Sequence, residues 1–91
     1  MILVYDSKAT QFDNDGLGAI TPSSCVVTEE INGALELELI HKTDGFGKWK
    51  RLQKNNIIRA PTHRGIQAFR IYRVVKNAVE GTIEENARQI I

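Results

Sequence analysis

Alternation of apolar and polar residues is the dominant pattern in this chain. Leu35, Leu37 and Leu39 alternate with Glu36 and Glu38, and two strand-like runs, residues 25–31 and 34–40, flank Asn32-Gly33. Such alternation predicts strands with one buried face, and Asn-Gly between two strands is a strong signal for a hairpin. We therefore expect strands over residues 25–31 and 34–40, joined by a tight turn.

The register of this hairpin has two alternatives. A strict two-residue turn sets Glu29 opposite Glu36, where like charges repel. A register slipped by one residue sets Val27 opposite Leu37 and Thr28 opposite Glu36, and it requires a three-residue loop or a bulge. We expect the slipped register, because it gives every side chain a suitable face.

Three further strand-like runs lie at residues 2–5, 56–60 and 66–76. Pro61 is expected to end the second run, because proline donates no hydrogen bond to a neighbouring strand. The third run is the longest and is apolar on both faces, which is typical of a strand that is central or covered by a partner. Strict alternation places Phe69, Ile71 and Val75 on one of its faces, and Tyr72 and Val74 on the other.

The segments between these runs are expected to be loops, with one short helix. Residues 6–18 and 41–47 have the composition of connections, the second turning at Asp44-Gly45. Phe46, Trp49 and Leu52 recur every three residues, which predicts one or two helical turns. Residues 77–81 are expected to form a turn. Residues 82–91 combine helix-forming residues with the strand parity of Ile83 and Ala87, so the pattern does not choose between helix and strand.

About six strands and one short helix around residues 46–54 indicate a mainly β fold. Strands and helices do not alternate, so we expect a small antiparallel β-barrel or split sandwich. The length of 91 residues corresponds to one domain, residues 1–91. Trp49 is expected to plug the end of the barrel, and the alternative is a solvent-facing platform for a ligand.

Composition argues against a disulfide-stapled, a membrane-spanning or a secreted protein. Cys25 is the only cysteine, so an internal disulfide is impossible. No apolar run reaches the roughly 20 residues of a membrane span, and the first residues lack the basic leader of a signal peptide. His41 and His63 are expected to be solvated loop residues.

Motifs for catalysis are missing as well. The chain contains no nucleophile elbow, no phosphate-binding loop and no pair of His or Cys residues at metal-ligand spacing. The run Asp13-Asn14-Asp15-Gly16 lacks the spacing of a calcium loop and is expected to be a plain turn. We therefore expect no catalytic, cofactor-binding or metal site.

Acidic and basic residues are segregated along the chain, although the net charge is only +1. Residues 25–40 contain four acids and no base, whereas residues 48–59 contain five bases and no acid. Three interpretations are open: two solvated faces, pairing between subunits, or a nucleic-acid patch with stacking aromatic residues. Because the overall charge is nearly neutral, we expect no specific binding of nucleic acid.

Four sequence blocks occur in a distinctive order. They are the Asn-Gly hairpin with its Leu-Glu-Leu-Glu strand, Lys-Trp-Lys at residues 48–50, Asn-Ile-Ile-Arg-Ala-Pro-Thr at 56–62, and Phe-Arg-Ile-Tyr-Arg-Val at 69–74. This order resembles the N-terminal region of siphophage tail-tip proteins, the tail-associated lysins or prophage tail endopeptidases. The resemblance covers residues 1–79. After Gly81 the family usually has a strand with aromatic residues and a histidine, and this chain departs from that pattern.

The resemblance implies a baseplate-hub-like domain at the N-terminus of a longer tail protein. Its expected place is the virion tail tip, after synthesis in the bacterial cytoplasm. Its expected partners are further copies, in a trimeric ring below the tail tube, and the distal tail and tail tube proteins, with no membrane partner.

In such a ring, an acidic face with Glu36 and Glu38 would suit a lumen that repels DNA. Any peptidoglycan hydrolase would lie in a separate C-terminal domain, so this domain is expected not to be an enzyme. The alternatives are a part of a cell-wall-degrading tail lysin, or a small nucleic-acid-binding β-barrel.

Overall fold

The computed structural model describes residues 2–9, 16–43 and 47–90. These residues form one seven-stranded sheet in the order β2-β1-β5-β6-β7-β4-β3, with every neighbouring pair antiparallel. The strands are β1 (Ile2–Tyr5), β2 (Gly18–Ile20), β3 (Ser24–Glu29), β4 (Leu35–Lys42), β5 (Ile57–Thr62), β6 (Gly65–Asn77) and β7 (Thr82–Gln89), and a single 3₁₀ turn, η1, spans Lys48–Arg51.

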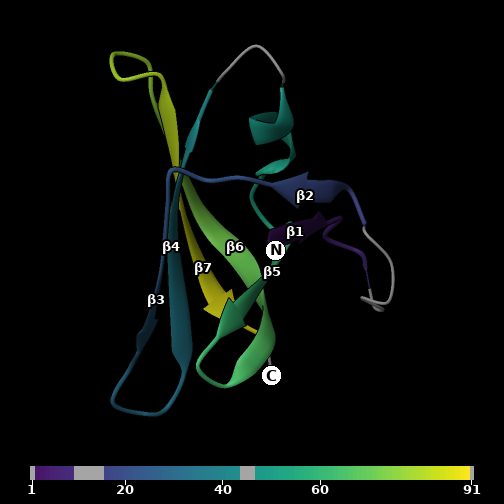
Figure 1. Cartoon of the computed structure of the whole chain (residues 1–91), viewed down its shortest axis with the longest axis vertical. Helices are drawn as coiled ribbons and strands as arrows, with labels where there is room; N and C mark the ends of the chain where they lie inside the picture. The colour runs from purple at the N-terminus through teal and green to yellow at the C-terminus, as the bar shows by residue number, and fades with distance from the viewer. Residues whose placement is uncertain (1, 10–15, 44–46, 91) are drawn as a thin grey trace.

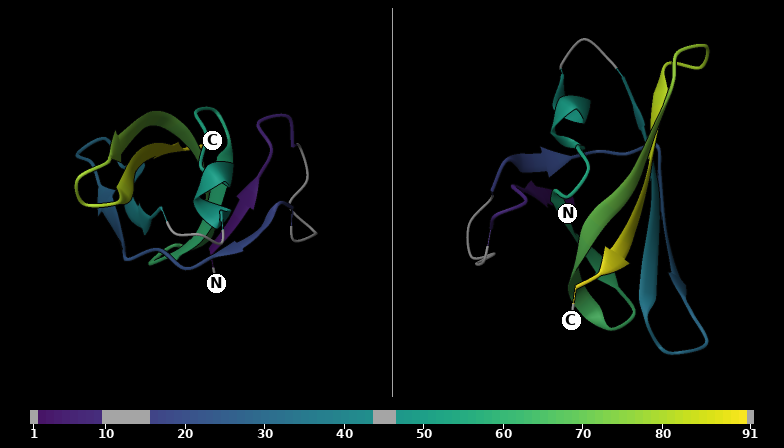
Figure 2. Two further views of the ribbon diagram at one scale, coloured as in Figure 1. Left: turned by 90° about the horizontal axis from the view of Figure 1, so that it is seen from above. Right: turned by 180° about the vertical axis from the view of Figure 1, so that it is seen from behind.

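The sheet curls into a half-barrel (Figures 1 and 2). Its first and last strands, β2 and β3, each have one hydrogen-bonded neighbour and do not pair with one another. The expected mainly β fold with almost no helix is confirmed. The described residues form a single curled sheet, which is a partly open barrel and not a two-layer sandwich. They contain seven strands, where the sequence indicates about six.

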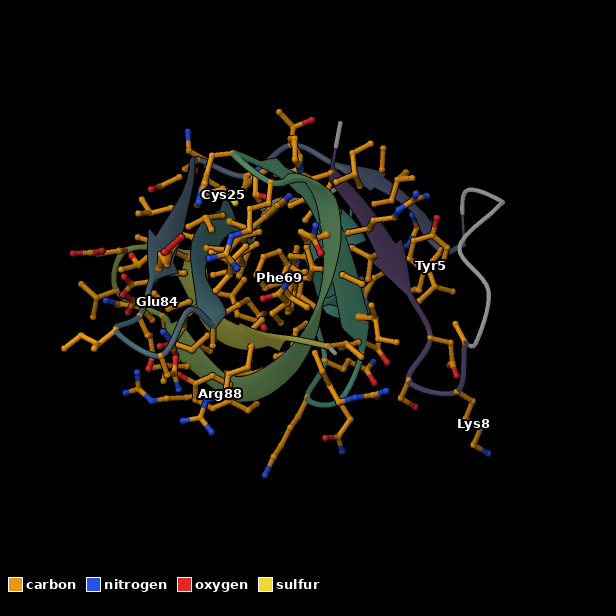
Figure 3. All side chains as sticks on the ribbon, turned by 90° about the horizontal axis from the view of Figure 1, so that it is seen from below. Tyr5, Lys8, Cys25, Phe69, Glu84 and Arg88 are labelled. Atoms are coloured by element: carbon orange, nitrogen blue, oxygen red, sulfur yellow. The ribbon has the colours of Figure 1, made fainter. Side chains whose placement is uncertain are left out.

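The core lies on the concave face of the sheet. Leu35, Leu37 and Leu39 of β4 are buried, while the glutamates between them face outward, which is the alternation that the sequence predicted. Viewed from below, Phe69 points into the ring of strands and Arg88 points away from it (Figure 3). The buried cluster comprises Val4, Ile20, Leu35, Leu37, Leu39, Leu52, Ile58, Ala60, Phe69, Ile71, Ile83 and Ala87.

The predicted slip in the β3–β4 hairpin is confirmed. Val27 pairs with Leu37 and Thr28 pairs with Glu36. The Glu30 amide donates to the Ala34 carbonyl (2.8 Å), which leaves a three-residue loop at 31–33. This loop requires a positive φ at its last residue, where Gly33 has φ 86°.

The strict alternation expected in β6 is wrong beyond Ile71. Ile71 pairs with Ala87, but Arg73 pairs with Asn86, so Tyr72 is an extra residue in a β-bulge. A bulge shifts the parity of the strand by one. Val74 therefore packs against the core, and Val75 is exposed on the outer face. The central position of β6 between β5 and β7 is as predicted.

Other boundaries also differ from the sequence-based expectation. Pro61 does not end β5 but lies inside it. The neighbouring strand β1 pairs only with residues 57–59 of β5, so no strand needs a hydrogen bond from residue 61 on that side. The short strand β2 was not predicted, since it has only three residues and two are Gly and Ala. Residues 82–89 form a strand and no helix. The predictions for Asp13–Asp15 and for Asp44, Gly45 and Phe46 lie outside the described residues.

Gly16 is held against β1 in a conformation that other residues rarely adopt. Its φ is +57°, and an added Cβ would lie 2.5 Å from the Tyr5 ring and 2.7 Å from the Val4 carbonyl oxygen. That oxygen already accepts a hydrogen bond from the Leu17 amide (2.8 Å), so it has little freedom to move.

We therefore expect Gly16→Ala to lower the free energy of unfolding by about 1–3 kcal/mol, measured by urea denaturation. Gly65→Ala is the matched control, because Gly65 also has a positive φ (+89°) but an added Cβ there meets no atom within 4 Å. Equal losses for the two variants would contradict a role for the contact with β1.

Candidate functional site

The 3₁₀ turn η1 presses Trp49 and Leu52 against one end of the half-barrel. Leu52 is 1% exposed, and Trp49 is half-buried and packs against the core cluster. Trp49 thus has the core contact expected of an anchor. The predicted helical segment is confirmed as one turn, because η1 is a single 3₁₀ turn of four residues.

Beside Trp49 lies a groove with an apolar floor and a cationic rim, which we call the Trp49 groove. Its volume is about 610 Å³. The ammonium of Lys76 lies 4.7 Å from the centre of the Trp49 ring, and that of Lys50 lies 6.0 Å away. The lining residues are Trp49, Lys50, Leu52, Gln53, Lys54, Val74, Lys76 and Ile83. Three of them are lysines and none is acidic, so the groove suits an apolar group that carries negative charge.

The loop of the β3–β4 hairpin forms a second feature, which we call the acidic tip (residues 29–33). Glu29 accepts hydrogen bonds from His63 Nε2 (3.0 Å) and Arg64 Nη2 (2.8 Å). The hydrogen bond from His63, followed by the charge of Arg64, lowers the pKa of the Glu29 carboxyl. Arg64 also donates through Nη1 to the Gly33 carbonyl (2.7 Å), so the β5–β6 turn holds the acidic tip in place.

A polar cluster crosses the outer face of the sheet. The Tyr72 hydroxyl donates to Glu36, and the Arg88 guanidinium lies 4.3 Å from the centre of the Tyr72 ring. Desolvation, and then the neighbouring Glu30, raise the pKa of Glu36, while Arg88 opposes the shift. The face with Glu36 and Glu38 is therefore not purely acidic, because Arg88 stands directly opposite Glu36.

One ionisable side chain lies inside the core. Glu85 is 0% exposed, and neither of its carboxylate oxygens has a hydrogen-bond partner among the described residues. Its cross-strand neighbours are Leu39 and Val74. Burial raises the pKa of Glu85 to about 8. A carboxyl with a shifted pKa is a common sign of an active site, but this one is fully enclosed and has apolar neighbours on both adjacent strands.

The two histidines differ from one another. The expectation that His41 lies on a solvated loop is wrong, because β4 continues to Lys42 and buries His41. The His41 Nδ1 atom lies 2.7 Å from the Lys42 carbonyl oxygen. His63 is exposed, as expected, and contacts Glu29. Cys25 is half-buried, and burial raises the pKa of its thiol.

Within the described part of the chain, no three or more His, Cys, Asp or Glu side chains are grouped so as to hold a metal ion. No helix there is both long and apolar enough to cross a membrane.

The basic run at residues 48–59 is evident in the sequence, but the groove is not. Lys50 and Lys54 of that run line it, whereas the Arg51 guanidinium turns toward Gly18. Lys76 joins the groove only because the β6 bulge brings Val74 and Lys76 to the concave face, where Lys76 pairs with Ile83. Nothing in simple alternation signals that shift.

Comparisons with protein-family models, with curated proteins and with solved structures found no match to this chain.

Proposed function

We propose that this chain is a structural domain of a phage or prophage tail tip, which assembles with further copies in a ring below the tail tube. The tail-tip assignment is supported by the four ordered sequence blocks at residues 32–38, 48–50, 56–62 and 69–74. In this proposal the domain has no catalytic role, and any peptidoglycan hydrolase belongs to a separate part of the tail protein.

The open half-barrel is the observation that carries the assembly part of the proposal. Among the described residues, the two edge strands β2 and β3 each lack a partner strand on one side. The strand β3 also carries Val26, which is 52% exposed. An edge with an exposed apolar side chain is a site where another chain adds. A small core and segregated charges also favour completion by neighbouring subunits.

The location is tested by immunogold electron microscopy on phage particles from the bacterium that carries the gene. We expect an antibody against this chain to label the distal end of the tail. A long reading frame beside a tape-measure gene would support the same class. Labelling that stays in the cytosol, with particles unlabelled, would contradict the proposal.

Two assays address the competing functions. We expect no clearing in a peptidoglycan zymogram, and turnover by this domain would replace the structural proposal with an enzymatic one. A nucleic-acid-binding barrel would shift the mobility of an oligonucleotide at low ionic strength, and salt would weaken that shift. We expect no such shift with this chain.

A further inference from the structure

We propose that the acidic tip of one copy of this chain docks in the Trp49 groove of a second copy. This inference rests on the self-association proposed above and names the two surfaces that make the contact. It is a heterologous interface, in which different patches of the same chain meet.

The apolar parts of the two surfaces match. Ile31 stands at the end of the acidic tip and is fully exposed, at 108% of its reference area. A single exposed isoleucine is unremarkable in itself. Here, however, the other end of the molecule carries a groove with Leu52, Val74 and Ile83 at its floor, and a tryptophan at its side. Inserting Ile31 would remove apolar area from water on both copies.

The charges of the two surfaces match as well. Glu30 lies next to Ile31 on the acidic tip, and both residues are exposed. The groove presents Lys50, Lys54 and Lys76 and no acid. A glutamate that enters beside Ile31 would therefore meet only positive charge, which favours this orientation over others and speeds association.

The acidic tip is already fixed in one conformation. Arg64 binds both the Glu29 carboxylate and the Gly33 carbonyl. Within the tip, Asn32 Oδ1 accepts a hydrogen bond from the Ala34 amide (3.0 Å). A preorganised loop loses little conformational entropy when it docks, so more of the contact energy appears as affinity.

The positions of the two surfaces set a head-to-tail assembly. The β3–β4 loop lies at one end of the long axis of the molecule and η1 lies toward the other (Figure 1). A contact between them joins copies head to tail. Head-to-tail contacts generate rings when the rotation between copies closes and open filaments when it does not, so the proposed ring requires a rotation that closes.

The test uses two variants that each remove one surface. Ile31→Asp removes the apolar side chain at the end of the acidic tip, and Lys50→Glu/Lys54→Glu reverses the charge of the groove. All three side chains are exposed, so we expect circular dichroism to show an intact fold for both variants. In sedimentation velocity, each variant alone should self-associate at least about tenfold more weakly than the unaltered chain.

An equimolar mixture of the two variants gives the decisive result. The Ile31→Asp variant keeps its groove, and the Lys50→Glu/Lys54→Glu variant keeps its tip, so one tip and one groove remain for a contact. The mixture should therefore form a heterodimer and nothing larger. The control Lys8→Glu/Arg73→Glu makes the same change in charge on other exposed positions and should assemble normally.

Three outcomes overturn the inference. If the chain forms a closed oligomer that neither variant weakens, the ring stands but the contact is elsewhere. If the unaltered chain stays monomeric, both the contact and the ring fail. If an oligonucleotide quenches the fluorescence of Trp49, the only tryptophan, and Lys50→Glu/Lys54→Glu abolishes that quenching without affecting self-association, the groove binds nucleic acid instead.

Discussion

Replacing Glu85 with glutamine is expected to remove most of the pH dependence of stability between about pH 4.5 and pH 8. In the folded chain the Glu85 carboxyl stays protonated up to about pH 8, because it is buried among apolar neighbours. In the unfolded chain it ionises near its ordinary pKa of about 4.3. Between these values the folded state binds more protons, so stability falls as the pH rises.

The expected size of this effect is large for a domain of this length. The difference between the folded and unfolded pKa values of Glu85 corresponds to a loss of roughly 5 kcal/mol in the free energy of unfolding between pH 4 and pH 8. The total free energy of unfolding of typical domains is about 5–15 kcal/mol. Below pH 4 the effect is absent, and above the folded pKa it levels off, since both states are then ionised.

Urea denaturation at several pH values measures the effect, and Glu84→Gln is the matched control. Glu84 is the preceding residue of β7 but is exposed, and Figure 3 shows it pointing outward. Glu84→Gln should keep the slope of stability against pH, whereas Glu85→Gln should flatten it. Glu85→Met should in addition raise the stability at pH 7, because it also removes the unpaired polar atoms from the core. An unchanged slope in both Glu85 variants would show that Glu85 is solvated or paired.

Phe69→Ala is the second substitution with a large expected effect. Phe69 is 0% exposed in the middle strand of the half-barrel and faces the core (Figure 3). Removing a buried phenylalanine side chain costs about 3–5 kcal/mol, because apolar contacts are lost and a cavity remains. A marginally stable domain would be largely unfolded by this change at 37 °C.

The matched control is Ile66→Ala on the same strand. Ile66 is 60% exposed, so its truncation should change the free energy of unfolding by less than about 1 kcal/mol. Trp49 fluorescence reports the transition in both variants. A loss for Phe69→Ala as small as that for Ile66→Ala would contradict the assignment of the concave face as the core.

The parts of the fold that follow from local chemistry were predictable. The hairpin register could be derived because like charges at Glu29 and Glu36 repel and because Asn32-Gly33 favours a short loop. The parts that depend on tertiary pairing were not. A bulge at Tyr72 leaves no mark in composition, yet it decides that Val74 and Lys76 face inward.

Glu85 is an intermediate case. Its position has the same strand parity as Ile83 and Ala87, so a strand assignment for residues 82–89 would have placed it in the core. The helix-forming residues around it obscured that parity in the sequence. The Trp49 groove could not be predicted at all, because η1, β6 and β7 meet there only in the folded chain.

In our proposal, this half-barrel works by associating with copies of itself. Native mass spectrometry of the chain across a series of micromolar concentrations tests it most directly. We expect one discrete closed oligomer, the trimer that the tail-tip resemblance implies, with monomer only at the lowest concentrations. A chain that remains monomeric at the highest concentration would contradict it.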